Sequence, residues 1–382
     1  MCLFLASRLA LFGVGLLSTW LLPSAHSLQQ PRNLVWHETA PRALEIWARW
    51  DSEWYLLIAA KGYDVGGLIT GSGVPYKPTA ASGFLPLYPV LIRGLTPLLG
   101  AVGAGVLISN FCLLVSLFLL HRLVRMEVDT ESSESAALVA CAALLLFPSS
   151  LFLSAVYAES LFLALSLGAF ILSRQGRFAA AGALAGLATL TRPFGILLVI
   201  PIVWEWWSRW RRREDIGGQT VSLWGWLGAM IPPAALLSYM LYCRSIFGDP
   251  LAFVHRQQRW RGSLSGPWRA FIRWWEAGPV AHGSHDSTLE LLVAVVCVVM
   301  FGFMVRKMRP SYTLYTAAGL LVTLGSTLWS FSRLALSLFP FFIFIGLSWS
   351  DGRRCLPVMY AFFGATLSGL LMALFANWWW VG

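Results

Sequence analysis

Runs of about twenty apolar residues recur along this chain of 382 residues, and charged side chains bound each run. A run of this length is what an α-helix needs to cross the hydrocarbon core of a bilayer. The chain is 57% hydrophobic and only 12% charged, whereas soluble proteins carry roughly 25% charged residues. These values exclude a soluble domain, and we predict an all-α, multi-pass membrane protein with a single integral domain over residues 1–382.

Eight runs have the length and composition of a membrane span, and a ninth, shorter run follows the same pattern. The expected spans are 3–22, 98–121, 136–153, 159–173, 223–243, 289–305, 312–329, 334–349 and 355–376. Together with the region 178–204, they predict about nine to eleven transmembrane helices. The first run also resembles a cleaved signal peptide, but its apolar stretch is longer than a signal core, which favours a retained anchor.

Arginine and lysine clusters in short loops indicate which end of each span faces the cytoplasm. The clusters are Arg122 and Arg125, Arg174 and Arg177, Arg209 with Arg211 to Arg213, Arg306 with Lys307 and Arg309, and Arg353 with Arg354. All fall on one side if 178–204 is a hairpin of two half-helices, broken by the proline and glycine of Thr191–Gly195. A single span kinked at Pro193 is the alternative. The hairpin leaves the loops 24–84 and 244–288 on the non-cytoplasmic side.

The first outer loop carries the signals of a helix. Pro41 is suited to begin this helix, and Gly62 is suited to end it. The apolar residues that would share one face are Leu44, Trp47, Trp54 and Ile58. We expect this helix to lie in the membrane interface, with its aromatic side chains buried and its polar side toward water.

Asp51 lies within this aromatic stripe, between Trp47 and Trp54. A carboxylate among tryptophans requires either a charged partner such as Arg49 or a function. Glu53 projects about 200° away around the helix, so the two carboxylates do not face each other. This arrangement disfavours a paired-carboxylate glycosidase site and favours a single working acid.

Three further charged residues are candidates: Glu159 and Arg333 at the outer ends of spans, and Arg192 in the break of the hairpin. Glu159 either stabilises a helix N-terminus or contacts substrate. Arg192, at membrane depth, must line a polar cavity or meet an anion. Arg333 is either an interfacial anchor or a phosphate ligand.

Composition also limits the partners and cofactors. The six cysteines lie in or beside apolar runs without CxxC spacing, so we expect neither a disulfide framework nor a metal site. Basic residues occur in short clusters between apolar runs and not along one polar face, which argues against nucleic acid. All basic residues except Lys61, Lys77 and Lys307 are arginines, which favours phosphate or carboxylate partners.

Six strings in a fixed order carry a family resemblance. They are RWDSEWYLLIAAKGY, FLPLYP, SAVYAESLF, LATLTRPFGILL, FVHRQQRW and SRLALSLFP. In this order they resemble the PIG-V-like mannosyltransferases, the group of GPI mannosyltransferase II, within the GT-C class of membrane glycosyltransferases. The resemblance runs from about residue 49 to about residue 345, and its first two strings are the most specific.

The resemblance implies transfer of mannose or a related hexose from a polyprenyl-phosphate donor to a lipid-linked acceptor on the non-cytoplasmic face. Asp51 matches the acidic residue of the first outer loop, where GT-C enzymes place their catalytic base. The reaction needs that base for the acceptor hydroxyl and a cation for the departing phosphate, for which Arg333 or Arg192 is the candidate. The expected substrate-binding residues are Arg49, Trp50, Glu53, Tyr88, Glu159, Arg192, Gln257, Trp260 and Arg333.

No DxD-like motif accompanies these residues, so we expect no metal and no cofactor. The sequence offers no second carboxylate facing Asp51, so we expect inversion by single displacement. The expected location is the plasma membrane of a bacterium or the endoplasmic reticulum membrane of a eukaryote. A transporter or flippase of a lipid-linked sugar is the main alternative, but it would show related halves, and the hydropathy has no such repeat. A structural subunit would leave the ordered motifs unexplained.

Overall fold

A computed structural model describes residues 1–25, 40–64, 78–127, 132–212, 215–216, 219–220, 223–278, 280, 287–349 and 355–382. The secondary structure of this part of the chain is helical except for one antiparallel hairpin of two-residue strands, in which Asp215 faces Thr220, and an isolated bridge between Val280 and Ser287. The all-α prediction is therefore confirmed for the described residues.

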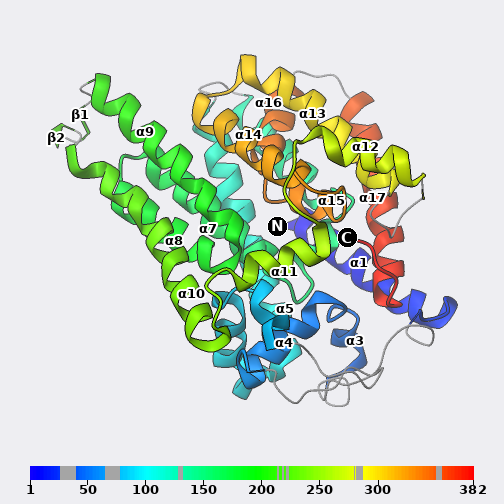
Figure 1. Ribbon diagram of the computed structural model, residues 1–382. Helices are drawn as coiled ribbons and strands as arrows, with labels where there is room; N and C mark the ends of the chain where they lie inside the picture. Colours follow the sequence, from blue (N-terminus) through cyan, green and yellow to red (C-terminus); the bar gives the residue numbers. More distant parts are fainter. Residues whose placement is uncertain are drawn as a thin grey trace.

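Figure 1 shows the elements in the order in which they follow along the chain. Up to the strands they are α1 (Cys2–Leu21), α3 (Arg42–Glu45), α4 (Asp51–Lys61), η2 (Pro78–Gly83), α5 (Leu87–Arg125), α6 (Ser133–Leu145), η3 (Ser150–Leu153), α7 (Glu159–Arg174), α8 (Phe178–Thr191), η4 (Pro193–Leu198) and α9 (Val199–Arg212). From the strands onward they are β1 (Asp215–Ile216), β2 (Gln219–Thr220), η5 (Leu223–Met230), α10 (Ile231–Phe247), α11 (Ala252–Arg261), α12 (Trp268–Ala277), α13 (Thr288–Lys307), α14 (Pro310–Leu324), α15 (Phe331–Ala335), α16 (Pro340–Trp349) and α17 (Cys355–Ala376).

Five stretches of the described chain are long and apolar enough to cross a membrane. They are Cys2–Leu21, Leu87–Arg125, Leu223–Phe247, Thr288–Lys307 and Cys355–Ala376. The count of nine to eleven spans remains a prediction. The single run expected at 334–349 is wrong, because the chain leaves the short helix α15 at Ala335 and Pro340 begins a separate helix.

The continuous helix expected between Pro41 and Gly62 is also wrong. The chain forms α3 and then α4, and Trp50 between them has φ 58° and ψ −113°. Tertiary hydrogen bonds replace helical ones here, since the amide of Val156 donates to the carbonyl of Trp47 at 2.9 Å. Gly62 does end α4, at φ 77°. The break makes Asp51 the first residue of a helix instead of a mid-helix residue.

The hairpin predicted for 178–204 is confirmed by the path of the chain. α8 ends at Thr191, Arg192 is extended at φ −148° and ψ 139°, and Pro193 begins η4. α9 then returns to the end from which α8 departed, because Arg209 donates a hydrogen bond to the carbonyl of Arg174. Figure 1 shows α7, α8 and α9 together on the left of the molecule.

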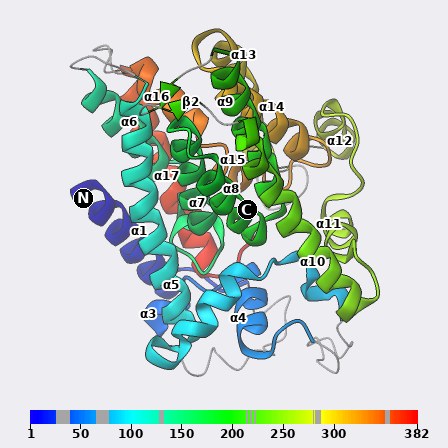
Figure 2. The same cartoon turned by 90° about the vertical axis from the view of Figure 1, so that its left-hand side faces the viewer.

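Four of the expected basic clusters meet at one end of the molecule. Glu127, just beyond α5, pairs with both Arg174 and Arg309. The residues that define this basic end are Arg125, Arg174, Arg209 and Arg309. The cluster at Arg353 and Arg354, like Arg213, lies outside the described residues. The first turns of α4 and α7 lie at the opposite end, and Figure 2 shows α3 and α4 at the bottom of the molecule, far from α9 and α13.

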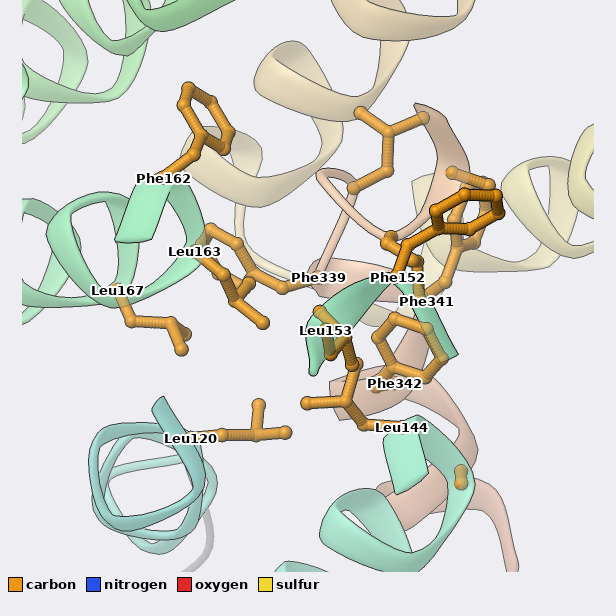
Figure 3. Packing of buried hydrophobic residues seen from close by; sticks show 14 of the residues in the cluster. Leu120, Leu144, Phe152, Leu153, Phe162, Leu163, Leu167, Phe339, Phe341 and Phe342 are labelled. Carbon is orange, nitrogen blue, oxygen red and sulfur yellow. The ribbon is translucent and has the colours of Figure 1, made fainter. Parts of the chain in front are cut away.

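Aromatic and aliphatic side chains fill the centre between α5, α6, α7 and α16, as Figure 3 shows for Leu120, Leu144, Leu163 and Phe342. Phe339 and Phe170 meet edge to face with ring centroids 4.9 Å apart, and such a pair contributes about 0.5–1.5 kcal/mol beyond its burial.

Small residues bring helices close together elsewhere. A side chain added at Gly346 would lie 2.9 Å from the Cβ of Ala140, so α16 approaches α6 closely only with glycine there. The alanine- and glycine-rich helix α8 likewise packs against α7, α10 and η5. This tight packing fixes the end of α8, where Arg192 stands.

Candidate active site

A cavity of about 930 Å³ opens at the end of the molecule opposite the basic end. Its charged lining residues are Asp51, Glu53, Glu159, Arg192, Arg256, Arg261 and Arg333. Its aromatic lining residues are Trp50, Trp54, Tyr55, Phe84, Phe194, Phe253, Trp260, Trp329, Trp378 and Trp380. The volume and the mixture of charge with aromatic rings suit a polar ligand with ring faces.

Asp51 enters this cavity from the first turn of α4. The backbone before it is held by Tyr157, whose hydroxyl donates to the carbonyl of Arg49 at 3.1 Å and accepts from the amide of Asp51 at 3.2 Å. These bonds fix the unusual backbone of Trp50 and therefore the direction of the Asp51 side chain. Tyr157 itself is buried, so the support for Asp51 comes from the core.

A chain of four alternating charges crosses the cavity wall. Arg333 Nη1 lies 2.7 Å from Asp51 Oδ2, and Arg333 Nε lies 3.6 Å from Glu159 Oε1. Arg192 Nη1 lies 2.9 Å from the same oxygen of Glu159. A second carboxylate, which the spacing within the first loop did not provide, therefore stands near Asp51 with Arg333 between them.

Separate elements position these charges. Glu159 is the first residue of α7, where a negative charge is favoured, and Arg192 stands in the break after α8. Arg333 lies in α15, whose first turn is held by the carboxylate of Glu290 from α13. Glu290 accepts hydrogen bonds from the amide and the hydroxyl of Ser332, the latter at 2.9 Å.

The electrostatic surroundings keep Arg333 charged. Burial alone would lower the pKa of its guanidinium, but the negative charges of Asp51 and Glu159 outweigh burial and hold that pKa above its usual value. The guanidinium also lies over the rings of Tyr157 and Trp380, with centroids 5.4 and 5.7 Å away. Arg333 is thus a fixed cation.

Residues with a strained backbone line the same cavity. Trp50, Ser330 and Trp378 are the non-glycine residues of the described chain with positive φ, and all three line it. Such conformations cost about 1–3 kcal/mol each and persist where the surrounding structure enforces them, commonly at functional sites. Trp50 precedes Asp51, and Ser330 precedes α15 with its Arg333.

An aromatic wall faces the charges. The rings of Trp54 and Phe84 stack with centroids 5.8 Å apart, and Arg256 lies over the ring of Trp260 at 4.3 Å. Gln257 from the same helix, α11, reaches the carbonyl of Gly83 at 3.5 Å. Segments far apart in sequence, η2 and α11, thus close this side.

The structure brings most of the sequence-predicted site residues together. The predicted residues that line the cavity are Asp51, Trp50, Glu53, Glu159, Arg192, Gln257, Trp260 and Arg333.

Two predicted residues lie elsewhere. Tyr88 is fully buried, bonds to Gly105 and Ser109 within the core and does not line the cavity, so the structure does not support its expected contact with substrate. Arg49 is also outside the lining, because it pairs with Glu45 and donates to the carbonyl of Ala376.

Sequence reasoning missed Arg261 as a site residue and gave the C-terminal tryptophans no role. The sequence feature that could have identified Arg261 is its position in the long outer loop, which places it on the same side as Asp51. Trp378 and Trp380 reach the cavity because α17 ends beside α1, where Asn377 and Ser18 are hydrogen bonded. Only the fold provides that contact. Within the described residues, no cluster of three acidic, histidine or cysteine side chains is arranged for a metal ion.

A sequence model of the family described as Mannosyltransferase (PIG-V) matches residues 4–209, more than half of the chain. The chain belongs to this mannosyltransferase family. The matched segment of this PIG-V family chain contains Asp51, Glu159 and Arg192, whereas Arg333 and α11 follow it.

Individual proteins resemble the PIG-V family chain over part of their length. GPI mannosyltransferase 2 of Yarrowia lipolytica is 28% identical over 185 residues, which cover 46% of this chain and 48% of that protein. GPI alpha-1,6-mannosyltransferase 2 of Rattus norvegicus is 34% identical over 161 residues, covering 40% and 30%. The chain thus spans less than half the length of these curated relatives.

Among solved structures, ArnT from Cupriavidus metallidurans bound to undecaprenyl phosphate is similar with a TM-score of 0.42 and 15% identity, covering 98% of this chain and 77% of that one.

Proposed function

We propose that this chain is a GT-C-type glycosyltransferase that moves mannose, or a related hexose, from a polyprenyl-phosphate donor to a lipid-linked acceptor. Membership of the PIG-V family supports the sugar and the reaction class. The observation that carries the proposal is Asp51, held by Arg333 in the wall of a large cavity that arginines and tryptophans line.

Asp51 is the general base in this proposal. Its Oδ2 is bound by Arg333, so Oδ1 takes the proton from the acceptor hydroxyl. The acceptor oxygen forms its bond to the anomeric carbon of the sugar as the bond from that carbon to the phosphate oxygen breaks. The electron pair leaves with the phosphate, and the products are the glycosylated acceptor, polyprenyl phosphate and a protonated Asp51.

The arrangement of the carboxylates supports single displacement with inversion. Glu159 is a buried carboxylate near the half-buried Asp51, and both Arg192 and Arg333 contact its Oε1. The two guanidinium groups on Oε1 compensate the negative charge of Glu159, which makes it a weaker nucleophile than a free carboxylate. We assign Arg192 and Arg333 to holding the two carboxylates, since both arginines are already paired.

Two lipid substrates require a site at a membrane surface. The apolar helices support an integral membrane location, and the cavity lies at the end opposite the arginine clusters, which cytoplasmic loops favour. We therefore assign the reaction to the non-cytoplasmic face.

The test is the Asp51→Asn variant in a reconstituted transfer assay. Asparagine keeps the shape and can still accept a hydrogen bond from Arg333, but it cannot take the proton, so the rate should fall roughly 100- to 10,000-fold. Asp249→Asn is the matched control, because Asp249 lies outside the cavity and bonds to His255. Full transfer by Asp51→Asn would refute the assignment.

A further inference from the structure

Arg261 differs from the cavity arginines already assigned. Arg192 and Arg333 pair with carboxylates, whereas among the described residues no carboxylate lies within 4.0 Å of the Arg261 guanidinium. Arg261 is the last residue of α11 and lines the same cavity as Asp51. Arg261 is half-buried, and a guanidinium shielded from water without a paired carboxylate is stabilised when an anion joins it.

The hydrogen bonds of Arg261 use one of its three nitrogens. Nη2 donates to the carbonyls of Thr323 and Thr327, each at 3.0 Å, while the buried Nε has no partner. A guanidinium carries five N–H donors in a planar fork that matches two oxygens of a phosphate. The observed bonds therefore anchor the group and leave an edge of it for a ligand.

Helix capping accounts for part of this arrangement. The two carbonyls belong to the last turn of α14 and the residues after it, where a positive charge is favoured. Arg273 from α12 does the same from outside the cavity, donating to the carbonyl of Ser326 at 3.2 Å. Capping explains Nη2 of Arg261 but not the orphaned Nε, and it makes Arg273 the natural reference residue.

Charges of both signs act on Arg261. Burial, and after it the charge of Arg333, lower the pKa of the Arg261 guanidinium to about 10, whereas the charge of Glu290 opposes this shift. The same repulsion that penalises this cation favours an anion, and a site shielded from water strengthens that attraction.

Apolar side chains continue the cavity away from Arg261. Leu264, in the segment after α11, and Val322, on α14, both line it, yet they are 68% and 44% exposed. They lie where the cavity meets the outer surface, and Figure 2 shows α11 and α12 along the same side of the molecule. A polar site for an anion thus borders an apolar opening. This arrangement suits a ligand that has a charged phosphate at one end and an apolar chain at the other.

We propose that Arg261 binds the phosphate of the polyprenyl-phosphate donor and that the polyprenyl chain leaves the cavity over Leu264 and Val322. This inference rests on the proposed transferase function and assigns a binding site to the phosphate of its donor. The phosphate then lies in the same cavity as Asp51, and the phosphate ligand is an arginine that no carboxylate already occupies.

The experiment measures binding to the full chain in lipid nanodiscs by tryptophan fluorescence, since Trp260 and Trp329 line the cavity. Three probes are titrated: a short-chain polyprenyl phosphate, the polyprenol of equal length, and inorganic phosphate. Arg261→Gln should weaken binding of the polyprenyl phosphate roughly 10- to 100-fold and leave binding of the polyprenol unchanged. Arg273→Gln, the control, should bind all three probes as the wild type does.

Equal effects of Arg261→Gln and Arg273→Gln, or no effect of either, would reduce Arg261 to a helix cap and overturn the proposal. So would inorganic phosphate binding as tightly as polyprenyl phosphate, because the chain would then contribute nothing. If Arg261→Gln does not fold, Arg261→Lys decides the matter: it keeps the charge but loses the planar fork. The lysine variant should bind polyprenyl phosphate more weakly than Arg273→Gln, and wild-type affinity would overturn the proposal.

The two proposals fail separately. Normal binding by Arg261→Gln together with an inactive Asp51→Asn would reject the phosphate site and keep the transferase. Binding that depends on Arg261 together with a fully active Asp51→Asn would keep the phosphate site and reject the base.

Discussion

Glu159 is the residue on which the charge arrangement of the cavity depends most. Its carboxylate is 4% exposed and contacts both Arg192 and Arg333. Asp51 also pairs with Arg333, but Arg192 has no other carboxylate partner among the described ion pairs. Loss of the Glu159 charge would leave Arg192 buried without compensation.

We therefore expect Glu159→Gln to destabilise the protein by about 3–5 kcal/mol, the typical effect of breaking a buried ion pair. The control is Glu134→Gln, because Glu134 is 56% exposed and pairs with His121 at the surface, where an ion pair contributes at most about 1 kcal/mol. Thermal unfolding in detergent compares the two variants. Equal unfolding temperatures would show that the Glu159 charge contributes no more than a surface charge.

For single residues, the sequence predicted which charged side chains belong to the site better than it predicted the ion pairs that they form. Asp51, Glu159, Arg192 and Arg333 were found because charge near an apolar run is costly and needs an explanation. Their pairing was not predictable, because it depends on where α4, α7, α8 and α15 meet. Tyr88 is the opposite case, a residue whose role the sequence left open. A tyrosine beside two prolines is compatible with a substrate groove as well as with the core, and only its contacts with Gly105 and Ser109 show that it belongs to the core.

The turn between α8 and η4 is the element that places Arg192. Gly195 closes the turn by donating to the carbonyl of Arg192 at 2.9 Å. A Cβ at Gly195 would lie 2.6 Å from the carbonyl carbon of Ala188 and from the Cα of Thr189. These are backbone atoms of α8, so neither can yield without moving the helix.

Gly195→Ala should therefore destabilise the protein by about 1–3 kcal/mol through overpacking and reduce transfer by displacing Arg192. Gly302→Ala provides the comparison, since Gly302 in α13 has no atom within 4 Å of an added Cβ. Removal of a helical glycine stabilises by roughly 0.5–1 kcal/mol. Unfolding temperature and transfer rate are measured for both, and a Gly195→Ala variant equal to the wild type in both would contradict the tight turn.

The bounds of a helix were predictable from the sequence where a long apolar run or a helix-breaking residue determined them. The runs at 3–22, 289–305 and 355–376 coincide closely with α1, α13 and α17, and the break at Thr191–Gly195 follows from proline. The first outer loop failed because long-range hydrogen bonds override helical periodicity. Tyr157 and Val156 form hydrogen bonds with the backbone around Trp47–Asp51, and no local sequence pattern predicts these bonds.

The whole molecule has two chemically different ends. Arginines from α5, α7, α9 and the segment before α14 gather at the basic end, and the cavity with Asp51 opens at the other. Arginine clusters in short loops favour the cytoplasmic side, whereas a long segment such as 244–288, which carries arginines of its own, translocates largely regardless of charge. The topology thus predicts that reporters at the two ends become accessible from opposite faces of the membrane.

Single cysteines at Gln175, Arg211 and His255 test this orientation in a background without the native cysteines, of which Cys2 and Cys355 are exposed. A membrane-impermeant thiol reagent applied to intact cells should label the variant at His255 and spare those at Gln175 and Arg211. After permeabilisation all three should react. Opposite accessibility of Gln175 and Arg211 would mean that 178–204 crosses the membrane once, contrary to the contact between Arg209 and Arg174. Protection of His255 in intact cells would instead place Asp51 on the cytoplasmic face, where the proposed lipid donor would have to present its sugar from the other leaflet.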